Sequence, residues 1–400
     1  MERVKKVLFA NRSTLPTLPD DIIFYHIFPR LPVKSIHRFR CVSTSCRRLT
    51  SDRNFLAALR LHSGRYFLSF STSMHWQLAP YSVNRSGAAS AVPISGNHLT
   101  YAKIVNGLML TVHGGYKTLV VSVSNTVTNE RFLLPSFPEP SSMDMMHFYF
   151  CHEPETDRYK VLRTTAIGAY NDANPTIMKY SVFTLGAHAT WKDYTLLQLY
   201  QTGNSRSVCI NGTLYCTRFS WNNSVDGHIS VIGAFTVKRK CFYAVKYPDG
   251  LPSSRYNHCH LIEMNGALAI ADVDRDFDCR AMKVWIKEKG KFRFGEETWT
   301  EHRIEFDPRW EAIYGLPLSY SFSTSLDGEI MMGSTRMRSG HGCWIFVYDM
   351  ERREWRIVEI EGLGDRMILG NFSIDEYVES PFLLRQILYP SSHQLVSKIV

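Results

Sequence analysis

The hydrophobic pattern of the chain changes near Gly64. Before this point apolar residues recur three and four positions apart, as at Phe24 and Phe28, and this spacing predicts amphipathic helices. After it, short runs of alternating apolar and polar residues are separated by turn residues, which is typical of β-strands. We therefore expect a small helical module over residues 16–62 and an all-β domain over 63–390. Short tails, 1–15 and 391–400, flank them.

The helical module has signals for short helices. The first starts within residues 17–20, where a proline in the first turn and two acidic residues suit a helix N-terminus. Pro29 should end or kink it, because proline has no backbone N–H. A second helix is expected from Val33 to about Arg40, a third around residues 43–49, and a brief fourth over 55–59. Helices this short bury little surface, so we expect a partner to cover their apolar side.

A unit of two hairpins recurs in the all-β domain. Each first hairpin has a short polar turn, and each second hairpin leads from an apolar strand to a large aromatic residue. The units start about 50 to 65 residues apart, which is the period of a four-stranded kelch-type blade. The turns are Asn106-Gly107, Pro154–Asp157, Asn211-Gly212, Asn265-Gly266 and Asp327-Gly328, and the aromatics are Phe132, Trp191, Phe242, Phe292 and Trp355.

Five such units are visible in the sequence. A sixth would combine strands near 65–71 and 376–384, which would pair the two ends of the domain and remove open sheet edges. The predicted fold is thus a small all-α, three-helix module followed by an all-β, kelch-like propeller with six blades. An open all-β sandwich is the alternative, but its strands have no reason to repeat as paired hairpins.

Charge is concentrated near the amino end. The net charge is +9, and eight Lys or Arg residues lie between Lys34 and Arg65 with a single carboxylate, Asp52. This distribution favours an acidic partner for the helical module, either a protein surface or a nucleic acid.

The sequence lacks signals for secretion or membrane insertion. The apolar run Val7–Ala10 is too short for a signal-peptide core, and no later run has the length of a membrane span. The nine cysteines are scattered without the spacing of a zinc or redox pair, which favours free thiols in a reducing compartment. We expect an intracellular protein, cytoplasmic or nuclear or both, without a membrane partner.

Candidate chemical sites are weak. Aspartates alternate from Asp272 to Asp278, but Cys279 and Trp285 occupy the positions where a calcium loop started at Asp274 needs Gly and Glu. We therefore expect these aspartates to form a charged, solvated strand edge or turn. His258 and His260 would share one face of a strand, yet a metal site needs further ligands. No nucleophile motif is present. We expect no enzyme activity, no cofactor and no metal.

Two parts of the chain carry a family resemblance. The segments Leu18–Ile23, Arg30–Ser35 and Phe39–Ser43 are in the order and spacing of an F-box, and this region resembles the plant type. Downstream, Glu153–Val161 and Tyr377–Ser380 are similar to landmarks of the F-box-associated domain. The resemblance therefore spans nearly the whole chain.

The resemblance implies the substrate-recognition subunit of an SCF-type (Skp–cullin–F-box) ubiquitin ligase. The F-box would dock on a Skp-family adaptor, which joins the cullin and the RING subunit, while the propeller would bind a protein substrate for ubiquitination. The apolar residues that would form the adaptor-binding surface are Leu18, Pro19, Ile22, Ile23, Ile27, Leu31, Pro32, Val42 and Leu49.

Three residues depart from the family pattern. His26 stands where a carboxylate is usual, Pro29 where a leucine-like residue would lengthen the first helix, and Cys46 where a tryptophan is usual. Loss of that tryptophan would weaken adaptor binding unless Phe55 fills its place.

Two other functions remain open from the sequence. One is a carbohydrate-binding or galactose-oxidase-like propeller protein, which would need ligands converging from several blades. The other is a nucleic-acid-binding protein that uses the basic amino-terminal segment. We regard both as less consistent with the combined pattern.

Overall fold

The computed structural model has two compact units, Met1–Ser63 and Gly64–Val400. In the first it describes residues 19–42, 46, 50, 55, 58 and 59. In the second it describes 65–71, 76–82, 88–90, 94–95, 99–115, 118–125, 128, 130–137, 145–156, 158–167, 177–186, 189–196, 199–201, 206–223, 227–256, 258–274, 280–288, 297–310, 320–325, 328–334, 343–361, 372–377 and 384.

The first helical segment changes its winding before Pro29. It consists of a short α-helix, Asp20–Ile22 (α2), a π-helical turn, Ile23–Ile27 (η1), and a 3-10 turn, Phe28–Arg30 (η2). The backbone N–H of Phe28 donates to the carbonyl of Ile23, five residues earlier. In a regular α-helix a proline ring collides with the carbonyl four residues before it, so the wider turn accommodates Pro29. The predicted early end of this helix is confirmed.

The second helix, Val33–Val42 (α3), starts where the sequence predicts and continues two residues beyond Arg40. The carbonyl of Pro32 begins it by accepting the N–H groups of Ser35 and Ile36 at 2.8 and 3.2 Å. Of the later predicted helices, Cys46, Phe55, Ala58 and Leu59 are described, and all four are helical. The remainder of those predictions lies outside the described residues.

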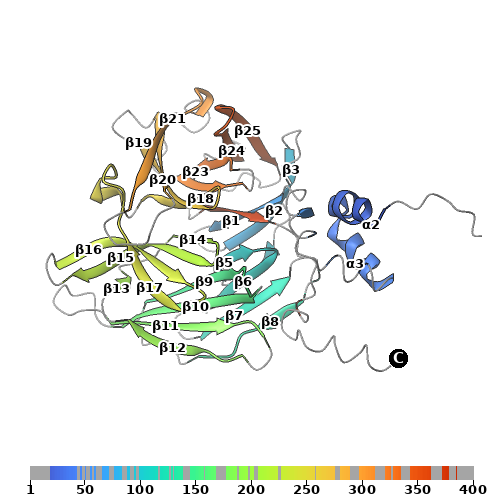
Figure 1. Cartoon of the computed structure of the whole chain (residues 1–400), viewed down its shortest axis with the longest axis horizontal. Helices are drawn as coiled ribbons and strands as arrows, with labels where there is room; N and C mark the ends of the chain where they lie inside the picture. The colour runs from blue at the N-terminus through green and yellow to red at the C-terminus, as the bar shows by residue number, and fades with distance from the viewer. Residues whose placement is uncertain are drawn as a thin grey trace, which may run out of the picture. The chain divides into compact units, whose positions relative to one another are not determined.

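The described strands of the second unit form six sheets (Figure 1). Five of them are blades that each follow one stretch of chain. These blades are Leu99–Val105 (β5), Leu108–Gly115 (β6), Thr118–Asn125 (β7) and Arg131–Leu133 (β8); Met145–Glu153 (β9), Arg158–Ile167 (β10), Ile177–Thr184 (β11) and Lys192–Leu196 (β12); Leu199–Gln201 (β13), Ser207–Ile210 (β14), Thr213–Asn223 (β15), Gly227–Thr236 (β16) and Cys241–Val245 (β17); His260–Met264 (β18), Ala267–Asp274 (β19), Ala281–Lys287 (β20) and Trp299–Glu305 (β21); Tyr320–Thr324 (β22), Ile330–Ser334 (β23), Cys343–Asp349 (β24) and Glu354–Glu361 (β25).

The sixth sheet is a composite of both ends of the domain. It is ordered β26-β1-β2-β4, where the strands are Arg65–Ser71 (β1), Trp76–Ser82 (β2), Ile94–Ser95 (β4) and Phe372–Tyr377 (β26). The expected pairing of residues 65–71 with the carboxyl end is present, but its partner is β26 rather than a strand over 376–384. Ala88–Ser90 (β3) instead pairs in parallel with β25 and lies at the edge of that blade (Figure 1).

The six sheets are arranged in a closed ring. One strand from each of the five continuous blades contacts the corresponding strand of the next blade, in the order β5, β9, β14, β18 and β22. β26 contacts both β22 and β5, so the composite sheet joins the last blade to the first. The architecture is that of a β-propeller, and the open sandwich is wrong. The predicted count of six blades is also wrong: among the described strands, five blades are each built from one stretch of chain, and the remaining sheet is assembled from both ends of the domain.

The Asn-Gly turns have the backbone that the sequence predicts. Both residues have positive φ at Asn106-Gly107 (48° and 78°), Asn211-Gly212 (47° and 73°) and Asn265-Gly266 (50° and 76°), as a two-residue type I′ hairpin requires. Gly328 also has positive φ, 77°, while Asp327 lies outside the described residues. These turns lie at one end of the propeller, which we call the Asn-Gly end.

Neighbouring turns at the Asn-Gly end contact one another. The side-chain Nδ2 of Asn211 donates to the carbonyl of Gly266 in the next blade at 3.5 Å. One blade further, a Cβ atom on Gly328 would lie 2.9 Å from Oδ1 of Asn265. At position 328 glycine is therefore favoured both by the positive φ and by close packing between blades.

Apolar side chains fill the spaces between successive blades. Phe148, Phe150 and Val161 of the second blade are buried together with Leu110 and Val123 of the first. On the other side of the same sheet, other residues of the second blade pack against the third. Four of the predicted aromatics, Phe132, Trp191, Phe242 and Trp355, pack against these cores, while Phe292 lies outside the described residues.

Among the described residues, no helix is long and apolar enough to cross a bilayer. The cysteines that the structure describes are free thiols: Cys41, Cys46, Cys151, Cys209, Cys216, Cys241 and Cys259.

Candidate functional site

The helical unit presents large apolar side chains to solvent. Ile22 is 37% exposed, Ile27 39%, Phe39 40% and Val42 82%. We call these four residues the apolar surface. They come from the end of α2, the end of η1 and the last turn of α3. Elsewhere in the described part of the chain, the large exposed apolar residues are Val120 and Leu133 of the first blade.

An aromatic core lies next to the apolar surface. The Phe28 ring stacks on Phe39 with a centroid distance of 4.9 Å and meets the edge of Phe24 at 4.9 Å. Phe24 and Phe28 are buried, as are Val33 and Ile36. The small core is thus complete without Ile22, Ile27 and Val42, which leaves their apolar area available to another molecule.

The nine predicted adaptor-binding residues differ in exposure. Ile22, Ile27 and Val42 belong to the apolar surface, and Pro19 and Pro32 are also exposed. Ile23 and Leu31 are half-buried. Leu18 and Leu49 lie outside the described residues. None of the seven described residues is buried in the core of the chain.

Phe39 is a member of the apolar surface that was not predicted. The sequence places Phe39 within the F-box-like segment, but the residue was not among those expected to bind the adaptor. Its three-residue spacing from Val42 on α3 is the signal that could have found it, because residues three apart lie on one helix face.

The helical unit also has exposed basic side chains. Arg30, Lys34 and Arg38 are exposed on η2 and α3. Arg40, in contrast, is buried, and its guanidinium donates to Oγ1 of Thr50 at 3.5 Å. The exposed cations would attract an acidic partner, while Arg40 joins α3 to the following segment.

The three departures from the family pattern have different surroundings. His26 is exposed, Pro29 is buried in η2, and Cys46 is half-buried. The carbonyl of Cys46 accepts the hydroxyl of Thr50 at 2.6 Å. Phe55 is completely buried, so it contributes to the core of this unit.

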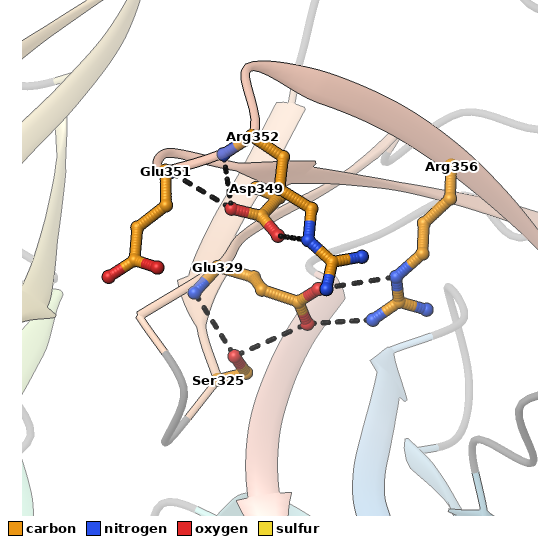
Figure 2. Close-up of polar contacts among 6 residues, drawn as sticks. All are labelled: Ser325, Glu329, Asp349, Glu351, Arg352 and Arg356. Carbon is orange, nitrogen blue, oxygen red and sulfur yellow. Dashed lines mark hydrogen bonds and ion pairs between the residues drawn. The ribbon is translucent and has the colours of Figure 1, made fainter.

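Several charged side chains at the Asn-Gly end of the propeller form hydrogen-bonded networks. In the last continuous blade Glu329 accepts two hydrogen bonds from Arg356, at 3.3 and 2.7 Å, and one from Ser325 (Figure 2). Asp349 accepts the backbone N–H groups of Glu351 and Arg352 at the next turn (Figure 2). These networks fix the turns.

A second such network links the second and third blades. Lys160 is buried, contacts Glu153 at 3.0 Å and donates to the carbonyl of Val237 at 2.9 Å. Burial raises the pKa of Glu153, but the hydrogen bonds from Thr156 and Lys160 outweigh it and hold the pKa below its ordinary value.

The aspartate run contains a buried ion pair. Both carboxylate oxygens of Asp272 accept hydrogen bonds from Arg255, one of them at 2.6 Å. Asp272 is buried, so the expectation of a solvated edge is wrong at this residue. The reason is that the 3-10 turn Ser253–Arg255 (η3) places the Arg255 side chain against Asp272. Asp276 and Asp278 lie outside the described residues.

The two histidines do not share one environment. His258 is exposed in a turn, whereas His260 is buried at the start of β18. Burial lowers the pKa of His260 well below its ordinary value, and Arg206 lowers it further. Its neutral Nδ1 accepts the backbone N–H of Phe322 at 3.4 Å. Within the described part of the chain, no three His, Cys, Asp or Glu side chains are grouped as metal ligands.

The chain matches two family models in succession. Residues 15–57 match the F-box domain, and residues 56–381 match the F-box associated beta propeller domain. The chain is 24% identical to "F-box protein DOR" of Arabidopsis thaliana, over 95% of this chain and 97% of that protein. It is 26% identical to "F-box only protein 8" of the same plant, over 59% of this chain and 83% of that protein.

A solved structure also resembles the chain. A chain in the crystal structure of a nidogen/laminin complex is 10% identical, with 78% of this chain and 99% of that chain covered and a TM-score of 0.40. This likeness is weak, and the propeller architecture rests on the sheets themselves.

Proposed function

Since the chain belongs to the family of plant F-box proteins that carry an F-box-associated β-propeller, we propose that it is the substrate-recognition subunit of an SCF-type ubiquitin ligase. Residues 16–62 would bind a Skp-family adaptor, and residues 63–390 would bind a protein substrate. The chain itself performs no chemistry in this proposal. It raises the effective concentration of a substrate lysine at the ubiquitin thioester, which other subunits supply.

The apolar surface is the observation that supports adaptor binding most strongly. Large apolar side chains at the centre of an interface supply most of its free energy once a partner removes them from water. Ile22, Ile27 and Val42 were expected in this role, and Phe39 joins them. The exposed Arg30, Lys34 and Arg38 would speed the encounter with an acidic adaptor.

The propeller supplies a rigid support for substrate recognition. We propose that the ring is kelch-like. Contacts of β26 with β22 and β5 support a closed ring, which leaves no open sheet edge between the first and last blades. Binding loops on such a support hold their positions without much ordering on association. If the chain acts in such a ligase, it acts inside the cell, in the cytoplasm or the nucleus.

A pull-down with a purified Skp-family adaptor tests the proposal. The intact chain should retain the adaptor, and a chain without residues 1–62 should not. Replacing both Leu18 and Pro19 with Ala should weaken retention while the thermal unfolding midpoint of the propeller stays unchanged. Failure of the intact chain to retain any adaptor would refute the proposed function.

Salt dependence separates the proposal from nucleic-acid binding. An adaptor complex with an apolar centre should survive moderate salt, because the hydrophobic contribution is not screened. Retention on DNA or RNA that falls steeply with salt would instead favour a nucleic-acid-binding protein.

A further inference from the structure

Two cysteine side chains meet where the second and third blades join. Cys151 lies on β9 and Cys209 on β14, and these two strands contact each other in the ring (Figure 1). The thiol of Cys151 is hydrogen-bonded to the sulfur of Cys209. Strands β10 to β13 separate the two residues in the sequence, so the folded chain alone brings them together.

The backbone next to this pair is also in close contact. A Cβ atom on Gly212, three residues after Cys209, would lie 3.2 Å from Cδ of Pro154 and 4.0 Å from Cα of Glu153. The backbone N–H of His152 donates to the sulfur of Cys209. The ends of β9 and β14 therefore hold the two thiols side by side. A disulfide, with its sulfurs about 2.05 Å apart, requires only a short further approach of groups that are already in contact.

The two thiols differ in their surroundings. Cys209 is half-buried, whereas Cys151 is buried. The hydrogen bond from Cys151 lowers the pKa of Cys209, and the N–H of His152 lowers it further, against the opposing effect of burial. The same hydrogen bond and burial raise the pKa of Cys151. Because the thiolate is the reactive form of cysteine, Cys209 is the thiol that reacts first.

We propose that Cys151 and Cys209 form an oxidation site, at which a peroxide converts the two thiols to a disulfide that joins the second and third blades. This inference goes beyond the role of substrate receptor and does not depend on it. Disulfides in a reducing compartment are transient and often serve redox sensing. Exchange with a dithiol would restore the two free thiols.

The reaction consumes one peroxide for each disulfide. The Cys209 thiolate attacks a peroxide oxygen, the S–O bond forms and the O–O bond breaks. The leaving hydroxide takes up the proton that Cys209 released, which gives a sulfenic acid and water. The sulfur of Cys151 then attacks the sulfenic sulfur, the S–S bond forms and the S–O bond breaks, and the hydroxyl leaves as water with the Cys151 proton. Two thiols and one hydrogen peroxide thus give one disulfide and two waters.

The disulfide would also change the stability of the propeller. It would close a loop that contains β10 to β13, and such a cross-link restricts the unfolded chain more than the folded one. Oxidation should therefore raise the thermal unfolding midpoint by about 3 °C or more, and reduction should reverse the change.

Peptide mapping of the full-length chain tests the inference. The folded, reduced chain is treated with hydrogen peroxide, the remaining thiols are alkylated in denaturant, and mass spectrometry of the digest identifies linked peptides. The Cys151–Cys209 linkage should be at least tenfold more abundant than any other, and dithiothreitol should remove it. Cys259 is an internal control that should stay reduced, because burial raises its pKa to about 12 and its thiol donates to the carbonyl of Tyr256 at 3.4 Å.

Single substitutions connect the change in stability to this pair. Cys209→Ala removes the thiol that reacts first, so it should abolish both the linkage and the rise of the midpoint on oxidation. Cys216→Ala is the matched control, because Cys216 is buried in the same core as Cys151 but pairs with Ser207 in the β14–β15 ladder; it should retain both effects. The midpoint of each reduced variant reports whether it is folded.

The same oxidation in urea shows whether the fold directs the linkage. Unfolding separates β9 from β14, so the Cys151–Cys209 linkage should fall to the abundance of other pairs. Four results would overturn the inference: no Cys151–Cys209 linkage in the folded chain, a more abundant linkage of Cys151 to Cys216, an equal yield of the Cys151–Cys209 linkage in urea, or a rise of the midpoint that survives Cys209→Ala.

Discussion

Truncation of Val42 to Ala examines the apolar surface with little risk to folding. Val42 is 82% exposed in the last turn of α3, so the change creates no cavity in the chain. It removes the equivalent of about two methylene groups, which contribute ~0.8 kcal/mol each when they are buried. If the adaptor covers the exposed 82% of the residue, the loss is about 1.3 kcal/mol, or about a tenfold weaker complex.

Isothermal titration of the full-length chain with a Skp-family adaptor measures this loss. Val120→Ala is the matched control, because Val120 is a 45% exposed valine on β7 of the propeller and undergoes the same chemical change. Its complex should keep the original dissociation constant within about twofold. An unchanged dissociation constant for Val42→Ala, or an equal loss for both variants, would contradict the assignment of the apolar surface to the adaptor.

Three further predictions concern the helical core, the Asn-Gly turns and the pH dependence of stability. Cys46→Trp should tighten the adaptor complex in the same titration, since it restores apolar area that the family pattern provides; weaker binding would show that the half-buried site is already filled. Gly328→Ala should lower the free energy of unfolding by about 1–3 kcal/mol in urea, because its φ is 77° and the new Cβ would meet Asn265 at 2.9 Å; Gly186→Ala, which meets nothing within 4 Å, should change it by less than about 0.5 kcal/mol. Because the pKa of His260 is lowered in the folded chain, the unfolded chain binds a proton below pH 6.5 that the folded chain does not bind. The free energy of unfolding should therefore fall below pH 6.5 by up to about 1.4 kcal/mol per pH unit. His260→Gln should reduce this slope, measured by urea unfolding between pH 7.5 and 5.5.

The repeating part of the fold could be predicted from local sequence. Asn-Gly pairs such as Asn211-Gly212 define a turn by their own backbone preferences, and the following aromatics mark the second hairpin of each blade. The composite sheet was harder to place. Its closing pair joins β1 to β26 across more than three hundred residues, and only tertiary contacts decide which residues of the carboxyl end pair with β1.

Chemistry at the candidate sites was only partly accessible to sequence reasoning. Ile22, Ile27 and Val42 were predicted from the F-box-like segment, and the structure shows that they are exposed. Phe39 was not predicted because a phenylalanine there serves equally well in a core, and in the structure it is partly exposed while it stacks on Phe28. The Arg255–Asp272 pair joins η3 to β19, and it depends on how the chain folds back between these two elements, which residue spacing does not encode.

Hydrogen–deuterium exchange of the full-length chain, with and without a Skp-family adaptor, tests most directly whether the helical unit is the docking site. Adaptor binding should slow exchange of the backbone amides in α2 and α3 and leave exchange in the five continuous blades unchanged. Slowed exchange confined to the propeller, or no change in α3 under conditions where the adaptor is bound, would contradict it.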